Sequence, residues 1–121
     1  MSYDEFVQAV AERASLEQAE AGRTATVVLQ ALCDRLTGDE AFDLLAPLPA
    51  RLKTAVTITQ APTRWTPEQF VERVAEQLEI EPGEARERIR AVFATIREAV
   101  PLGEFRDVLE QLDPGYADLL A

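Results

Sequence analysis

Three arginines stand close together on one predicted helix face in the second half of the chain. Arg86, Arg90 and Arg97 fall within about 40° of one another when each residue of an α-helix turns by about 100°. Planar guanidinium groups bind carboxylates and phosphates through paired hydrogen bonds, so this arginine stripe could receive an acidic segment or an anionic ligand. The simpler interpretation is that the three arginines pair with glutamates of the same acidic molecule.

A second group of residues with possible chemistry is a set of glutamates on the helix that precedes the stripe. They recur at three- and four-residue spacing and therefore share a face. Carboxylates bind hard cations, but a calcium loop also needs alternating oxygen ligands and a glycine turn, and a di-iron bundle needs Glu-x-x-His. We therefore expect a solvated acidic face, no metal site and no cofactor. These glutamates are Glu68, Glu72, Glu76 and Glu79.

Composition excludes several classes of function. The 121 residues include 22 acidic and 12 basic side chains, giving a net charge of −10, and there is no histidine. Without histidine the chain lacks the commonest general base and the commonest metal ligand, so we expect no catalytic residues and no enzyme. One cysteine cannot form a disulfide framework or a thiolate zinc site. The negative charge argues against nucleic acid as a partner, because such partners are held mainly through phosphates.

The patterning of apolar and charged residues predicts where the protein works. Apolar runs are a few residues long, far short of the roughly 20 that span a bilayer, so we expect no membrane segment. The acidic start at Met1-Ser2-Tyr3-Asp4-Glu5 is unlike a secretory signal, which predicts a cytoplasmic protein. Eleven arginines against the single Lys53, with many alanines, suggest GC-rich coding in a bacterium.

The chain contains an internal repeat. Sliding the sequence along itself until Phe6 falls on Phe70 aligns the two halves without a gap. Apolar positions, turns and helix caps then coincide together, which predicts a tandem duplication. Further matched pairs are Val10 with Val74, Glu20 with Glu84, Val28 with Val92, Glu40 with Glu104, Asp43 with Asp107 and Leu48 with Leu112.

Each repeat is predicted to begin with two helices. Ser2-x-x-Glu5 and Thr66-x-x-Gln69 are capping boxes that open the first helix of each repeat. Ser15-x-x-Gln18 offers a start for the second helix, and Pro82 does the same at a first-turn position in the other copy. The second helices should end near Leu36 and Val100.

Two shorter helices should complete each repeat. Thr37-x-x-Glu40 is a further capping box, opening a helix through Phe42, Leu44, Leu45 and Leu48, and its counterpart follows the break at Pro101 and Gly103. A last helix should follow Pro49 and, in the second repeat, Asp113-Pro114. The fold class is therefore all-α, built from two four-helix units.

The repeat defines the expected organisation of the chain. We expect one domain over residues 1–121, with unit 1 at about 2–53, a linker at about 54–65 and unit 2 at about 66–121. A unit of about 50 residues is marginally stable alone, so the two should pack against each other through their first and second helices. Trp65, directly before the Thr66 cap, is expected to pack as a hydrophobic staple rather than to stack on a ligand.

The two copies differ where the arginine stripe lies. The aligned positions in unit 1 are the small residues Gly22, Thr26 and Cys33, which leave a smooth strip that another helix could approach closely. Cys33 lies in a helical apolar stretch and is expected to be a buried, inert thiol.

The openings of the two units and the end of the chain resemble one protein family. Tyr3-Asp4-Glu5-Phe6-Val7-Gln8-Ala9-Val10-Ala11-Glu12-Arg13-Ala14 and Glu68-Gln69-Phe70-Val71-Glu72-Arg73-Val74-Ala75-Glu76 are similar to the start of the bacterial domain of unknown function DUF2267, and residues 103–116 are similar to its closing pattern. Leu48-Pro49 keeps the usual leucine-proline pair, whereas Asp113 departs from it. The resemblance implies a small, all-helical, bacterial, cytosolic protein and brings no catalytic residues.

These observations favour a non-enzymatic protein-interaction or scaffold module that acts through helical surfaces, with a partner protein or a second copy of itself. The candidate interaction residues are Arg86, Arg90 and Arg97 on one copy and Gly22, Thr26 and Cys33 on the other. The alternative is a small-ligand-binding domain, with an anionic ligand at the arginine stripe or an apolar ligand between the repeats.

Overall fold

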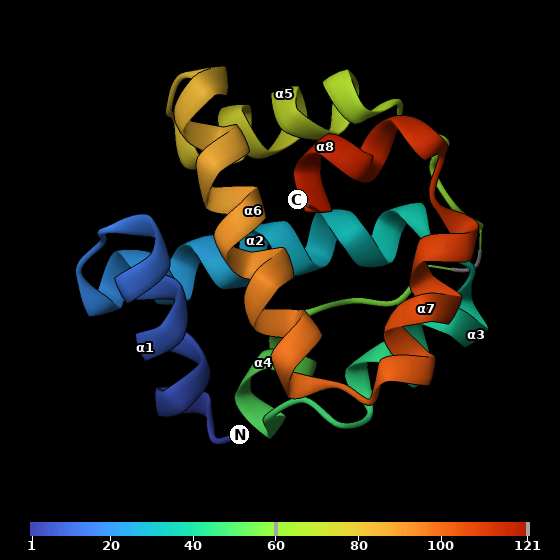
Figure 1. The fold of residues 1–121 in the computed structure, drawn as a ribbon, viewed down its shortest axis with the longest axis horizontal. Helices are drawn as coiled ribbons and strands as arrows, with labels where there is room; N and C mark the ends of the chain where they lie inside the picture. The colour runs from blue at the N-terminus through green and yellow to red at the C-terminus, as the bar shows by residue number, and fades with distance from the viewer. Residues whose placement is uncertain (60, 121) are drawn as a thin grey trace.

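The computed structural model describes residues 1–59 and 61–120. Gln60, in the predicted linker, and Ala121, at the end of predicted unit 2, lie outside the described residues. Within these ranges the chain forms eight α-helices and one short 3-10 helix, with no strand, which confirms the all-α class (Figure 1). The elements are α1 (Tyr3–Ala14), α2 (Gln18–Arg35), α3 (Gly38–Leu45), α4 (Ala50–Ala55), α5 (Pro67–Leu78), α6 (Pro82–Ala99), α7 (Leu102–Gln111), the 3-10 helix η1 (Pro114–Tyr116) and α8 (Ala117–Leu120).

The two predicted capping boxes at the starts of α1 and α5 are confirmed. The Ser2 hydroxyl accepts a hydrogen bond from the Glu5 amide at 3.1 Å, and the Glu5 carboxylate accepts one from the Ser2 amide at 2.9 Å. Thr66 and Gln69 exchange the same pair of bonds. Each box satisfies helix amides that have no partner within the helix, and so fixes the start of that helix.

The predicted start of the second helix at Ser15 is wrong. Ser15 ends α1 in the left-handed conformation, with φ at 57°, and its amide bonds back to the carbonyl of Ala11. The helix α2 begins after Glu17, which makes no side-chain cap bond. The chain has to turn sharply between α1 and α2, and a left-handed residue makes that turn in one step. Glu79, the residue aligned with Ser15 in the repeat, has the same conformation with φ at 58°.

The third capping box is only half formed. Thr37 accepts a bond from the Glu40 amide at 3.3 Å, as predicted. The Thr37 amide, however, donates to the side-chain oxygen of Gln111 on α7 at 3.0 Å. The Glu40 carboxylate is therefore not used as a cap, which leaves it available for other contacts.

Corresponding helices of the two halves begin at aligned positions of the repeat. This holds for α1 and α5, for α2 and α6 and for α3 and α7, whereas the fourth position is α4 in the first half and η1 followed by α8 in the second. These bounds fit the predicted repeat, whose origin by tandem duplication stays a prediction.

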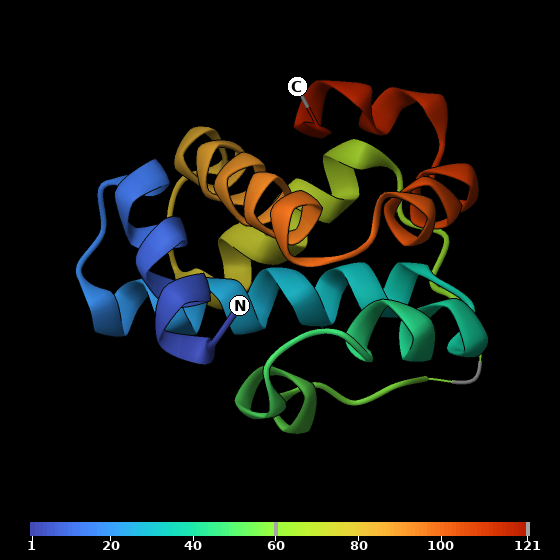
Figure 2. The same ribbon diagram turned by 60° about the horizontal axis from the view of Figure 1, so that its bottom comes forward.

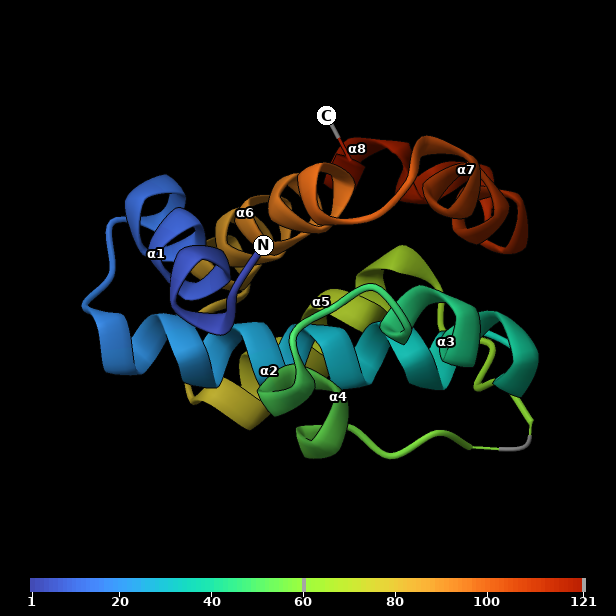
Figure 3. The same ribbon diagram turned by 90° about the horizontal axis from the view of Figure 1, so that it is seen from below.

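The two halves are interleaved. Helix α1 packs against α2 of its own half and α6 of the other, and α5 packs in the same way against α6 and α2. Figures 1 and 3 show α6 passing over α2, and the two helices are in contact. The expected packing through the first and second helices is therefore confirmed. Fully buried residues along this core are Phe6, Val10, Val28, Leu29, Phe70, Val74, Ile89, Val92 and Ile96.

Trp65 forms the predicted hydrophobic staple. Its ring meets Phe70, four positions after the Thr66 cap, edge to face at 6.4 Å between ring centroids. Its carbonyl accepts a hydrogen bond from the Tyr116 hydroxyl at 2.6 Å. Figure 2 shows residues 56–59 running from α4 past α3, and residues 61–64 leading to the start of α5. The Trp65 side chain thus fixes the angle at which the chain enters α5.

Candidate functional site

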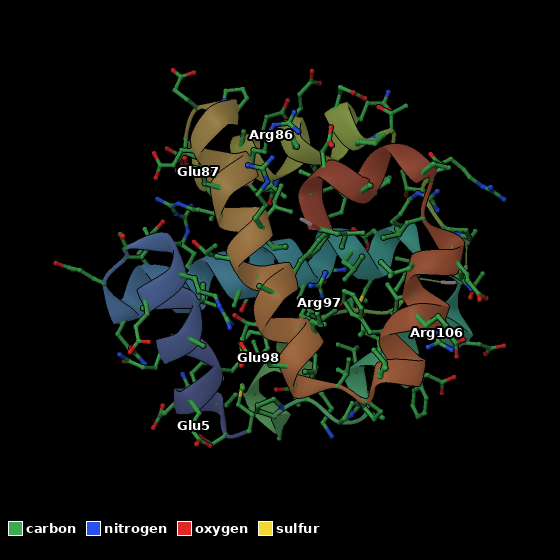
Figure 4. All side chains as sticks on the ribbon, in the orientation of Figure 1. Glu5, Arg86, Glu87, Arg97, Glu98 and Arg106 are labelled. Atoms are coloured by element: carbon green, nitrogen blue, oxygen red, sulfur yellow. The ribbon has the colours of Figure 1, made fainter. Side chains whose placement is uncertain are left out.

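The arginine stripe lies against the last helix. Arg90 Nε donates to the carbonyl of Asp118 at 2.9 Å, and Arg97 Nη2 donates to that of Leu120 at 2.8 Å. Figure 4 shows Arg97 on the side of α6 that faces α7 and α8. Carbonyls of a last helical turn have no partner within the helix, and arginine is a good donor to them. The structure thus places two of the three arginines on main-chain carbonyls rather than on glutamates, while Arg86 is half-buried.

The small residues of the first half are mostly interior. Gly22 and Cys33 are fully buried or nearly so. A methyl group on Gly22 would lie 2.9 Å from the Tyr3 hydroxyl, so the helix that approaches this strip closely is α1. Burial raises the pKa of the Cys33 thiol to about 12, which fits the inert thiol expected from sequence.

Thr26 lines a small cavity between the halves. The cavity has a volume of about 200 Å³ and lies between α2 and α5, near the end of α4. Its polar lining includes Gln30 and Asp34 on α2 and Arg73 and Gln77 on α5. The cavity is therefore a place where a small ligand could contact both halves.

Arg88, which the sequence analysis did not single out, joins the two halves at the α2–α6 crossing. Its side chain is buried and donates to Glu20 at 2.7 Å and to Thr24 at 3.0 Å on α2. It also donates through Nε to Glu84 on its own helix at 3.1 Å. Glu20 and Glu84 are a matched pair of the repeat, so one arginine serves two equivalent carboxylates. The alignment of the two halves places Arg88 opposite the small residue Thr24, and this difference could have identified Arg88 from the sequence.

The protonation states of this network follow from its contacts. Burial by itself lowers the pKa of Arg88, but the hydrogen bonds to Glu20 and Glu84 outweigh burial, so the pKa is raised and the guanidinium stays charged. The hydrogen bond from Arg88 lowers the pKa of Glu20. The network is therefore an ion pair of fixed charge and a link between the halves.

A second pair of equivalent glutamates meets where α3 packs against α7. Oxygen atoms of Glu40, Asp43 and Glu104 lie within 4.8 Å of one another. Glu40 is only 9% exposed, and one oxygen each of Glu40 and Glu104 is buried without a hydrogen-bond partner. Asp107 adds a fourth negative charge nearby. The sequence alignment paired Glu40 with Glu104 and Asp43 with Asp107, but nothing in it showed that the pairs face each other.

These carboxylates raise the pKa of Glu40 to about 7. Burial is the largest cause, followed by the adjacent carboxyl of Glu104 and the charges of Asp107 and Asp43. In the folded protein, therefore, Glu40 keeps a proton to higher pH than in the unfolded chain, where its pKa is the ordinary 4.5.

We expect the loss of the proton from Glu40 to lower the free energy of unfolding by about 2–3 kcal/mol as the pH rises from about 5 to about 8. The measurement is made with EDTA, so that no metal ion binds the carboxylates. Over this range the folded state binds more protons than the unfolded state, so raising the pH favours unfolding. Urea titrations of the wild type and of Glu40→Gln, which cannot ionise, measure the effect as the difference between their pH profiles. Parallel profiles would show that Glu40 does not titrate abnormally.

The acidic face of α5 behaves as expected from sequence. Glu68, Glu72, Glu76 and Glu79 are all exposed. Three of them border a shallow depression together with Ala75, Ile80 and Pro82. The sequence thus singled out exposed carboxylates, whereas Glu40, the one buried carboxylate of the described residues, lies at the α3–α7 contact.

An apolar groove lies along α3 beside the segment that follows α4. It has a volume of about 310 Å³, and Leu45, Val56 and Ile58 contribute apolar lining. Phe42, which the sequence placed on the apolar pattern of this helix, is 65% exposed at the groove. Lys53, the chain's one lysine, adds a positive charge to the lining.

No helix in residues 1–59 and 61–120 combines the length and the apolar character needed to cross a membrane.

A search of the curated proteins returns no match to the chain. A family model described as "Uncharacterized conserved protein (DUF2267)" matches residues 3–119, nearly the whole sequence. The resemblance seen in the openings of the two units is thus confirmed, and the chain belongs to the DUF2267 family.

Proposed function

We propose that this protein is a non-enzymatic interaction module that receives a segment of a partner protein in the groove beside α3. The observation that carries the proposal is the exposure of Phe42 at an apolar groove. Exposed aromatic side chains at the edge of an apolar depression are typical of sites that anchor a partner. Lys53 favours an occupant in which an apolar side chain stands next to a carboxylate, because the two charges are complementary.

The absence of enzymatic activity is part of the proposal. The chain has no histidine, and the hydroxyls of Ser2, Thr37 and Thr66 are hydrogen-bonded to helix amides. These hydroxyls support helix starts, which argues against their use as nucleophiles.

A photo-crosslinking experiment in the native host tests the groove. We expect p-benzoylphenylalanine at position 42 to give one major adduct, while the same residue at position 102 gives none. Leu102 is the matched control because it is 70% exposed and lies outside the groove residues. Mass spectrometry should place the adduct on a segment with an apolar residue beside an acidic one. An adduct with a second copy of the chain would make the module a homodimer, and equal labelling at both positions would contradict the proposal.

The cavity at Thr26 supports a second candidate function, the binding of a small ligand between the halves. Its lining joins apolar side chains to the oppositely charged Arg73 and Asp34, so a ligand with an apolar body and both donors and acceptors fits it. A compound found by thermal-shift screening that stabilises the wild type but not Arg73→Ala would favour this function over the groove.

A further inference from the structure

We propose that Glu40, Asp43 and Glu104 form a binding site for one divalent cation of the calcium type where α3 meets α7. The site is separate from the groove of the proposed function, and neither proposal depends on the other.

The spacing of the oxygens suits a calcium ion. Two ligand atoms at about 2.4 Å from the same ion can be at most about 4.8 Å apart, and calcium binds oxygen at 2.3–2.6 Å. The three carboxylates each have an oxygen within 4.8 Å of the others, so side-chain shifts of a few tenths of an ångström would let one ion touch all three.

The second observation is the burial of oxygen atoms that have no partner. Glu40 is about nine-tenths buried, and its Oε1 atom has no hydrogen-bond partner, as is also the case for Oε1 of Glu104. A buried carboxylate oxygen without a partner destabilises the fold, because it has lost its water and gained nothing in exchange. A cation bound between Glu40 and Glu104 gives both oxygens a partner.

At the α2–α6 crossing, another pair of equivalent glutamates meets and is neutralised by a cationic side chain. There the equivalent pair Glu20 and Glu84 shares the guanidinium of Arg88. At the α3–α7 contact, by contrast, no arginine or lysine of the described residues forms an ion pair with the four carboxylates. A bound cation would take the place that Arg88 has at the other contact.

Access and charge also favour a cation here. Asp43 is exposed, so an ion can enter from solvent and keep water molecules in its remaining coordination positions. Asp107 and the net charge of −10 raise the local concentration of cations. A proton shared between Glu40 and Glu104 is the alternative partner for their buried oxygens. Such a proton makes no contact with Asp43, whereas a cation binds all three carboxylates.

Isothermal titration calorimetry on the EDTA-treated, full-length chain at pH 7.5 tests the site with calcium chloride alone. We expect one saturable site per chain and a melting temperature that rises with calcium. Glu40→Gln and Glu104→Gln should each weaken binding about tenfold or more, as expected for loss of a ligand. The control Glu72→Gln removes the same charge from the exposed face of α5 and should leave the affinity unchanged.

Three results would overturn the proposal. One is no saturable binding up to about 10 mM calcium, the weak end of protein calcium sites. Another is an equal loss of affinity in Glu72→Gln, which would mean general attraction to a negative surface. The third is full affinity in Glu40→Gln. Circular dichroism shows whether each variant is folded, and since Glu40→Gln and Glu104→Gln remove a buried charge, they are expected to fold.

Discussion

Replacing Phe70 by alanine should lower the free energy of unfolding by about 3–5 kcal/mol. The Phe70 side chain is fully buried on α5, so its removal takes apolar surface out of the core and leaves a cavity. It also stands at the centre of an aromatic cluster, with ring centroids 5.9 Å from Phe93, 5.6 Å from Tyr116 and 6.4 Å from Trp65. The edge-to-face contacts with Tyr116 and Trp65 add to the effect of burial.

Urea unfolding followed by circular dichroism measures this loss, and Trp65 fluorescence reports the aromatic cluster directly. Phe42→Ala is the matched control, since it deletes the same side chain from a position that is 65% exposed. It should change the free energy of unfolding by less than about 0.5 kcal/mol. Similar losses in the two variants would mean that the cluster around Phe70 is not a centre of stability.

Replacing Arg88 by methionine should lower the free energy of unfolding by about 2–3 kcal/mol. Methionine fills much of the same space, so the main loss is the guanidinium that holds Glu20, Glu84 and Thr24 together. The value is below the 3–5 kcal/mol typical of a fully buried broken pair, because the side chains of Glu20 and Glu84 are 36% and 49% exposed and can turn to water.

The control for Arg88 is Arg86→Met, on the same helix two residues earlier, which should change stability by less than about 0.5 kcal/mol. Adding Glu20→Gln and Glu84→Gln to the methionine variant should recover part of the loss, because the two carboxylates then no longer repel each other. If Arg88→Met and Arg86→Met unfold at the same urea concentration, the Arg88 network does not link the halves energetically.

Much of the fold could be predicted because its signals are local. The capping boxes at Ser2 and Thr66 and the period of apolar residues determine where α1 and α5 begin, whatever lies around them. Ser15 was misassigned because serine suits both a helix start and a tight turn, and only the path of the chain into α2 decides between them. The internal repeat showed which positions of the two halves correspond, but not whether the side chains at those positions are in contact.

The sites were harder to predict because they form between segments distant in sequence. Glu40 and Glu104 are an ordinary matched pair in the alignment, and their contact depends on how α3 crosses α7. The arginine stripe was identified correctly as one helix face, yet the partners of Arg90 and Arg97 are main-chain carbonyls, which no pattern of side chains reveals. Spacing along one helix predicts a face but not the segment that covers it.

The interleaving of the two halves has a consequence for the synthesis of the protein. As the chain leaves the ribosome, α1 and α2 are complete long before α5 and α6, the helices against which each of them packs across the molecule. The parts of their apolar faces that α5 and α6 cover in the folded protein therefore stay exposed until those two helices have been translated. The nascent first half consequently carries apolar surface that is prone to aggregation, although the finished molecule buries that same surface.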